Sequence, residues 1–202
     1  MIMKKMFLVA SVLMLSVGAF AQHEVGSLTI QPKVGLNIAN YTGSDESDPR
    51  IGLAAGAEFE CQLTEMFSLS TGLLYSMQGS VATGTEQGIK VKTTAKTDYI
   101  NIPILANIYV AKGFALKLGI QPGFNVNSGY KASAMGVDVS GSLSDLGVDI
   151  KSFDFAIPVG LSYEFNNFVI DGRYNIGVMK MVENDDSKNS VFQFTLGYKF
   201  NL

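Results

Sequence analysis

The sequence has few of the residues on which most enzymes and small secreted folds depend. Among its 202 residues are one cysteine (Cys61), one histidine (His23) and no tryptophan. A single cysteine excludes a disulfide framework and a cysteine-based zinc site, and a single histidine excludes any mechanism that needs two. Charged residues make up 16% of the chain, against about 25% in soluble domains. With 15 basic and 18 acidic side chains there is no basic excess, which argues against nucleic acid as a partner.

The first 21 residues have the pattern of a secretory signal sequence. Lys4 and Lys5 form the basic segment, residues 6–17 the apolar segment, and residues 19–21 (Ala-Phe-Ala) a small-x-small cleavage site. We predict cleavage after this site, so that residues 22–202 form the exported domain. A transmembrane helix is the alternative, but the apolar run is shorter than the about 20 residues needed to span a bilayer. The mature chain contains no second run of that length, so any membrane it enters must be crossed by strands.

Eight segments of the mature chain alternate between apolar and polar or small residues. They cover residues 28–38, 51–63, 67–77, 100–110, 114–126, 153–165, 168–178 and 192–202. Alternation over this length is typical of a β-strand with two different faces. The connections between segments alternate between short turns and long loops, which is the plan of an outer-membrane barrel. The sequence therefore predicts an all-β fold, an eight-stranded antiparallel up-and-down transmembrane β-barrel.

Alternation alone does not distinguish a membrane barrel from a soluble β-sandwich or lipocalin-like barrel, because the strands of all three alternate. The composition of the polar face distinguishes them. A solvent-exposed face is rich in long polar side chains, whereas this one is rich in glycine, alanine and serine. Its few charges are balanced in sign. They are Lys33, Arg50, Lys117, Arg173, Lys199, Glu58, Glu60, Asp154, Glu164 and Asp171. Such a set suits the crowded interior of an eight-stranded barrel, so we predict that the apolar face contacts lipid.

Charges in that interior must be paired, because each unpaired buried charge costs several kcal/mol. We predict a structural ion-pair network in the lumen. Its members are Lys33, Glu58, Glu60, Lys117, Glu164, Asp171, Arg173 and Lys199. Arg173, near the middle of its segment, is the predicted centre, with Glu58, Glu60 and Glu164 as candidate partners.

Four prolines fall inside the alternating segments: Pro32, Pro103, Pro122 and Pro158. Each lacks the N–H that a strand donates to its neighbour, and a closed barrel has no free edge to accommodate it. We therefore expect these prolines at β-bulges or near the rims of the barrel.

Five segments carry a family resemblance. They are residues 33–40 (KVGLNIAN), 72–79 (GLLYSMQG), 99–103 (YINIP), 153–155 (FDF) and 173–177 (RYNIG). Together they resemble the PorT-like outer-membrane β-barrel family of Gram-negative bacteria, whose members are similar to the eight-stranded OmpX and OmpA barrels. The resemblance covers nearly the whole mature chain and implies a location in the outer membrane. One member is linked to protein secretion, but most have no assigned activity, and that role is not transferred.

The sequence contains no recognisable catalytic motif. No nucleophile and general base can be paired from their spacing, so we predict a non-enzymatic protein with no catalytic, cofactor-binding or metal-binding residues. His23 is interpreted as part of a disordered tail on the periplasmic side, and Cys61 as a small apolar residue that faces lipid. Two groups of loop acids could hold Ca²⁺, but they match no calcium loop and are interpreted as solvated charge. These acids are Asp45, Glu46, Asp48, Glu183, Asp185 and Asp186.

The two longest loops, 79–98 and 127–152, contain alternating stretches of their own. We predict strands that continue beyond the membrane as protruding hairpins, whose edges can bind an extracellular protein or surface ligand; mobile loops that shield the rim are the alternative. The leading hypothesis is a monomeric barrel in outer-membrane lipid, with loops for binding, adhesion or envelope integrity. The alternatives are a small pore, a transport- or secretion-associated barrel, a lipid-active enzyme and a soluble periplasmic ligand-binding barrel.

Overall fold

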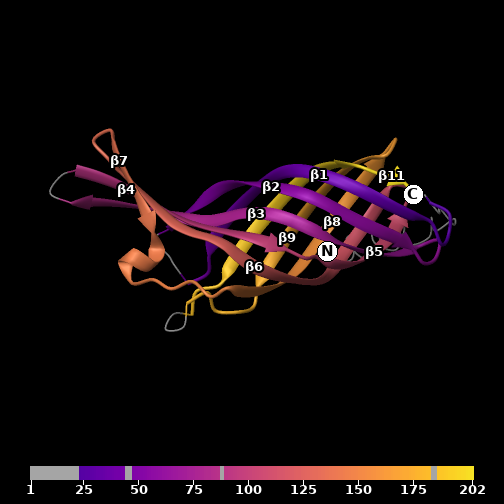
Figure 1. Ribbon diagram of the computed structural model, residues 1–202. Helices are drawn as coiled ribbons and strands as arrows, with labels where there is room; N and C mark the ends of the chain where they lie inside the picture. Colours follow the sequence, from indigo (N-terminus) through magenta and orange to yellow (C-terminus); the bar gives the residue numbers. More distant parts are fainter. Residues whose placement is uncertain (1–22, 44–46, 87–88, 183–185) are drawn as a thin grey trace, which may run out of the picture.

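The chain forms a closed antiparallel β-barrel in a computed structural model that describes residues 23–43, 47–86, 89–182 and 186–202 (Figure 1). The predicted signal sequence lies outside these residues. The strands are β1 (Leu28–Tyr41), β2 (Ser47–Gln62), β3 (Phe67–Glu86), β4 (Ile89–Asn101), β5 (Ile104–Ala111), β6 (Phe114–Ala134), β7 (Val137–Ser142), β8 (Phe153–Phe165), β9 (Phe168–Gly177), β10 (Asn189–Tyr198) and β11 (Phe200–Asn201). A short 3₁₀ helix, η1 (Leu143–Leu146), follows β7. Within the described residues, no helix is both long and apolar enough to cross a bilayer.

Within the described part of the chain, eight strands close the ring, in the order β1, β2, β3, β4 with β5, β6, β8, β9, and β10 with β11. β4 and β5 are one barrel strand, since the register against β3 is the same before the break (Asn101 opposite Leu74) and after it (Ile104 opposite Thr71). β10 and β11 continue each other in the same way along β1. β1 pairs with both β2 and β10, which closes the barrel. The predicted eight-stranded up-and-down barrel is therefore confirmed.

Side-chain burial alternates along the barrel strands, and the apolar side chains lie on the outside. Leu118 is 55% exposed and Ile104 is 38% exposed, whereas Arg173 is only 3% exposed. Because successive residues of a strand point to opposite faces, this alternation separates an outer apolar surface from an inner polar one. The orientation predicted from the sequence is confirmed.

None of the four prolines lies at a β-bulge, the first of the two places expected for them. The pairing register is unchanged on either side of Pro32, Pro103, Pro122 and Pro158. A proline lacks only the N–H that faces one of its two neighbouring strands, so a single ladder is interrupted while the other continues. Pro158, for example, stays paired with Asn175 on β9, while the pairing of β8 with β6 is interrupted beside it.

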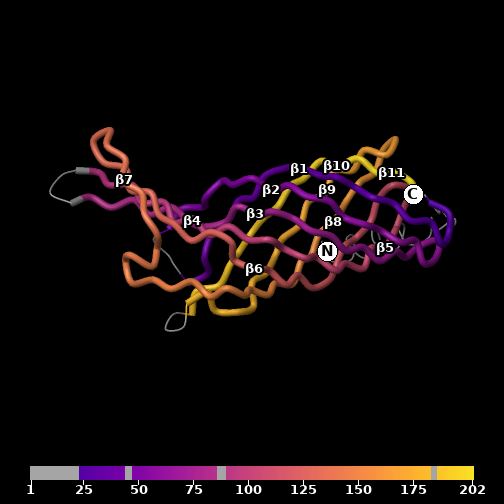
Figure 2. Tube along the Cα trace, in the orientation of Figure 1, coloured from indigo at the N-terminus to yellow at the C-terminus, as the bar shows by residue number. Residues whose placement is uncertain are grey.

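Two hairpins continue beyond the barrel at the end away from the C-terminus (Figure 2). β3 and β4 stay in one register from Leu74 opposite Asn101 to Glu86 opposite Ile89. β6 pairs with β4 on one side and with β7 on the other. The result is a four-stranded sheet, in the order β3-β4-β6-β7, that stands outside the barrel wall. The predicted protruding hairpins are confirmed.

Candidate functional site

The centre of the barrel interior holds a five-membered charge cluster, contributed by strands β1, β2, β6 and β9. Arg173 places Nη1 2.9 Å from Glu58 Oε1 and Nε 2.8 Å from Asp171 Oδ1. Lys33 Nζ lies 2.9 Å from Glu58 Oε2 and 3.6 Å from Asp171 Oδ2. Lys117 Nζ lies 2.7 Å from Asp171 Oδ2. All five side chains are buried, so each is compensated by opposite charge in a region without bulk water.

A second cluster surrounds Lys199 on the side of the short turns. Its Nζ lies 2.8 Å from Glu60 Oε2 and 2.9 Å from Glu164 Oε2. The hydroxyls of Ser68 and Tyr109 both donate to Glu60, and Lys199 also donates to the Tyr109 hydroxyl over 3.0 Å. The structure thus places Glu60 and Glu164 with Lys199 and not with Arg173, which pairs with Glu58 and Asp171.

A third group lies at the base of the protruding hairpins. Arg50 Nη1 is 3.2 Å from Asp98 Oδ1, and Arg50 also donates to the carbonyl of Gln78. Asp98 Oδ2 accepts hydrogen bonds from Tyr75 (3.0 Å) and Asn127 (2.9 Å). Asp98 is therefore the ion-pair partner of Arg50, for which the sequence suggested none.

His23 belongs to the barrel interior and not to a disordered tail, so that interpretation was wrong. Its Nε2 lies 3.0 Å from Glu164 Oε1, and just after it the backbone N–H of Gly26 donates to the carbonyl of Gln62 over 2.7 Å. These two bonds attach the segment before β1 to the mouth of the barrel. The attraction of a buried carboxylate for an imidazole N–H explains why the segment is ordered.

Several inward positions of the alternating pattern hold apolar or aromatic residues. Leu74 and Leu105 are each only 1% exposed, and Tyr99 and Tyr109 are also buried. They lie in the inward register of β3, β4 and β5, between the small and polar residues. Leu74 shares the strand parity of Ser76, and Leu105 that of Asn107, so the period of two is the sequence signal that places them inside despite their apolar character.

The protruding sheet has two chemically different faces. Residues directly opposite each other in an antiparallel ladder point to the same face, and the register sets Thr83 opposite Lys92 and Lys92 opposite Ser133. We call this side the lysine face. Its polar members are Lys90, Lys92, Lys96, Lys131, Thr83, Thr85, Thr94, Ser133, Asp138, Ser140 and Ser142, and its apolar member is Val81, opposite Thr94. The other side carries small and apolar residues, among them Ala82, Val91, Ala95, Ala132 and Val139.

One ion pair lies on the lysine face. Lys131 Nζ is 2.9 Å from Asp138 Oδ2, and the Ser133 hydroxyl donates to Asp138 Oδ1. That hydrogen bond, together with the nearby Lys131 ammonium, lowers the pKa of Asp138 below its ordinary value. Among the described side chains, Lys90, Lys92 and Lys96 have no carboxylate within ion-pairing distance.

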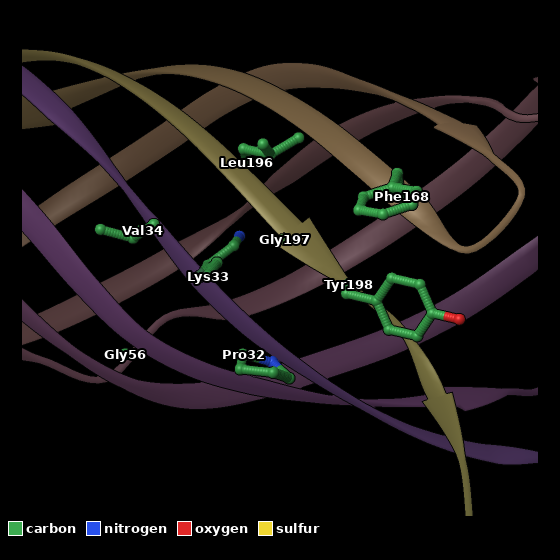
Figure 3. Close-up of a pocket in the computed structure, with 8 residues that line it drawn as sticks. All are labelled: Pro32, Lys33, Val34, Gly56, Phe168, Leu196, Gly197 and Tyr198. Atoms are coloured by element: carbon green, nitrogen blue, oxygen red, sulfur yellow. The ribbon is translucent and has the colours of Figure 1, made fainter.

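A shallow depression marks the outer wall where β1 meets β10 (Figure 3). It lies beside Pro32, where the ladder between these strands is interrupted. The lining is mainly apolar, with Val34, Phe168, Leu196 and Tyr198 around it. The depression is therefore part of the apolar outer surface of the barrel.

The described residues contain no group of three or more histidine, cysteine or acidic side chains that could hold a metal ion. Of the loop acids considered for Ca²⁺, Asp45, Glu46, Glu183 and Asp185 lie outside the described residues. Asp186 forms an ion pair with Lys180. Cys61 is a free, half-buried thiol on β2.

A closed barrel with an apolar outer band and a polar interior is the architecture of a transmembrane β-barrel. The chain belongs to the outer membrane protein beta-barrel domain family, which matches residues 20–183. The protein is therefore an integral protein of the Gram-negative outer membrane. No curated protein sequence matches the chain.

Solved structures with a similar fold include outer-membrane proteins of three kinds of bacteria. Ail, the attachment invasion locus protein of Yersinia pestis, is 17% identical, with 88% of this chain and 100% of that chain covered and a TM-score of 0.49. Neisserial surface protein A is 11% identical, with 86% and 97% covered and a TM-score of 0.47. OprG from Pseudomonas aeruginosa is 12% identical, with 88% and 97% covered and a TM-score of 0.43. At these identities the similarity concerns the fold alone.

Proposed function

We propose that this protein is a non-enzymatic, monomeric outer-membrane barrel with a filled lumen, which holds a β-sheet at the cell surface for binding. The observation that carries the proposal is the central charge cluster. Arg173 on β9 reaches Glu58 on β2, and Lys117 on β6 reaches Asp171 on β9, although neither pair of strands is adjacent in the ring. These ion pairs therefore run across the lumen, where they occupy the space that a pore would need.

The sheet of β3, β4, β6 and β7 supports the second half of the proposal. In the described part of the chain, β7 pairs only with β6, which leaves its other edge open to strand addition. An edge of this kind on the outer surface of a cell is accessible to an extracellular protein or surface ligand. Envelope integrity would need no such protrusion, so the sheet favours binding or adhesion.

Within the family, the PorT-like group is the branch that we propose for this chain. Its support is the set of motifs in the strands, of which residues 33–40 and 173–177 contain Lys33 and Arg173 of the central cluster. The proposal covers the type of barrel and carries no secretion role with it.

Planar-bilayer conductance of the purified, refolded protein tests this function. A heat-modifiability gel first establishes the folded fraction, since folded barrels in detergent migrate differently before and after boiling. We expect no conductance steps from the folded protein, because the cluster fills the lumen. Reproducible steps in the nanosiemens range, in proportion to the folded fraction, would overturn the proposal in favour of a pore.

A further inference from the structure

We propose that the lysine face of the protruding sheet binds an extended anionic polysaccharide that carries repeated sulfate or phosphate groups. The inference deepens the proposed function, since it names the class of ligand for the sheet. Four cations and six hydroxyls share this face. Asp98 follows Lys96 on the same side of β4 but is buried in its ion pair with Arg50, so the one exposed carboxylate described on the face is Asp138. That carboxylate is already paired with Lys131, which leaves Lys90, Lys92 and Lys96 for a ligand.

The spacing of the lysines favours an extended ligand over a single small anion. Lys90 and Lys96 are six residues apart on β4, or about 20 Å at about 3.3 Å per strand residue. Lys131 lies beside this row, since it is opposite Thr94 on the neighbouring strand. One phosphate ion spans only a few ångströms and reaches at most two neighbouring lysines, such as Lys90 and Lys92, about 7 Å apart along β4, whereas a chain of anionic sugars contacts the whole row.

The height of the lysines above the membrane favours a polysaccharide as their ligand over the lipid phosphates of the outer leaflet. Ile100, opposite Tyr75, is the last outward apolar residue of β4 before the sheet leaves the barrel. Lys92 lies eight residues further on, or about 26 Å along the strand. The headgroup layer of one leaflet is only about 5–8 Å thick, so even a tilted strand carries Lys90 and Lys92 well beyond lipid phosphates.

The neighbours of the lysines favour sugar over nucleic acid. Proteins that bind single strands stack the bases on aromatic side chains, and the lysine face has none among its described members. It has threonine and serine hydroxyls instead, including Thr83 and Ser133 on either side of Lys92. Hydroxyls between cations suit a ligand that alternates anionic groups with sugar hydroxyls.

Binding of dextran sulfate to the full chain in lipid nanodiscs, measured by surface plasmon resonance, tests the inference. Uncharged dextran of the same length is the reference, and we expect binding of dextran sulfate alone, with affinity that falls steeply as salt is raised. The variant Lys90→Gln/Lys92→Gln/Lys96→Gln should lose at least tenfold in affinity. Its matched control, Lys112→Gln/Lys151→Gln/Lys188→Gln, removes the same charge elsewhere and should stay within twofold of the wild type.

A further variant makes the test independent of a loss of folding. Asp138→Asn removes the one exposed acid described on the lysine face and releases Lys131, so affinity for dextran sulfate should rise. No binding of dextran sulfate, equal loss in both triple variants, or tighter binding of a DNA oligonucleotide of equal charge would each overturn the inference. None of these outcomes bears on the proposed function, which bilayer conductance tests separately.

Discussion

Arg173 and Asp171 lie two residues apart on β9 and face each other inside the barrel, with Nε 2.8 Å from Oδ1 and Nη2 2.8 Å from Oδ2. Two parallel hydrogen bonds of this kind fix the plane of the guanidinium. The same guanidinium then turns its remaining edge to Glu58 on the far strand β2. Asp171 therefore orients Arg173 so that the arginine can link two strands across the lumen.

Replacement of Arg173 should destabilise the barrel strongly. Arg173→Met leaves Glu58 and Asp171 buried with less positive charge around them, and the loss of one partner of a buried ion pair costs about 3–5 kcal/mol. Urea unfolding in lipid vesicles measures the change in the free energy of unfolding. Lys131→Met breaks an exposed pair and should cost less than about 1 kcal/mol. Equal effects of the two substitutions would contradict a structural role for the central cluster.

The hydroxyl of Tyr109 should contribute to the stability of the barrel. It donates to Glu60 and accepts from Lys199, so Tyr109→Phe leaves a buried carboxylate short of one donor, at a cost of about 1–3 kcal/mol. Tyr163 is 48% exposed on the outer surface, and Tyr163→Phe is the matched control with little expected change. The same urea titration compares the two, and a neutral Tyr109→Phe would show that Ser68 and Lys199 suffice for Glu60.

Close strand contact makes Gly35 intolerant of a side chain. A Cβ at this position would lie 1.9 Å from the carbonyl oxygen of Phe194 on β10, so Gly35→Ala must push β1 and β10 apart. We expect a loss of folding yield or a cost of at least about 1–3 kcal/mol. At Gly84, in the protruding hairpin, a Cβ would meet nothing within 4 Å. Gly84→Ala should therefore leave folding unchanged. A normal yield of folded Gly35→Ala would show that β1 and β10 lie further apart than in the structure.

The hydrogen bond from Ser133 to Asp138 gives the protruding sheet a dependence on pH. Because the pKa of Asp138 is lowered in the folded hairpin, its charged form stabilises the β6–β7 pairing above the ordinary pKa. That contribution disappears as the pH falls through the lowered value. An NMR titration of the Asp138 carboxyl carbon should show the lowered pKa in the wild type and a value nearer 3.8 in Ser133→Ala. An identical titration curve in both proteins would contradict the assigned cause.

The sequence predicted the strands and their orientation because both depend on a local period of two. It did not predict which charges meet. Glu60 and Glu164 are placed beside Lys199 and not Arg173 by the stagger of strands around the ring, which no spacing along the chain reveals. Asp98 was missed because the alternating segment was predicted to begin at residue 100, which left Asp98 in a loop, whereas β4 already begins at Ile89.

Contacts between distant parts of the chain are the second feature that the sequence did not predict. His23 and Glu164 are 141 residues apart in the sequence, and nothing near His23 indicates that it packs into the barrel mouth. Leu74 and Leu105 are apolar like the outer surface, and only their strand parity with Ser76 and Asn107 indicates that they face inward. The bulges expected at the prolines are absent for a related reason, because a barrel strand can lose one of its two ladders locally and keep its register through the other.

The central claim is that the apolar side chains contact lipid while the polar set lies inside. Because the chain contains no tryptophan, a single introduced tryptophan reports its own surroundings without background. Leu118→Trp places one on the outer surface, and Tyr99→Trp places one at an interior position that is 1% exposed. In vesicles of lipids with brominated acyl chains, we predict strong quenching of the fluorescence of Leu118→Trp and little quenching of Tyr99→Trp. Quenching of Tyr99→Trp with Leu118→Trp unaffected would contradict the account.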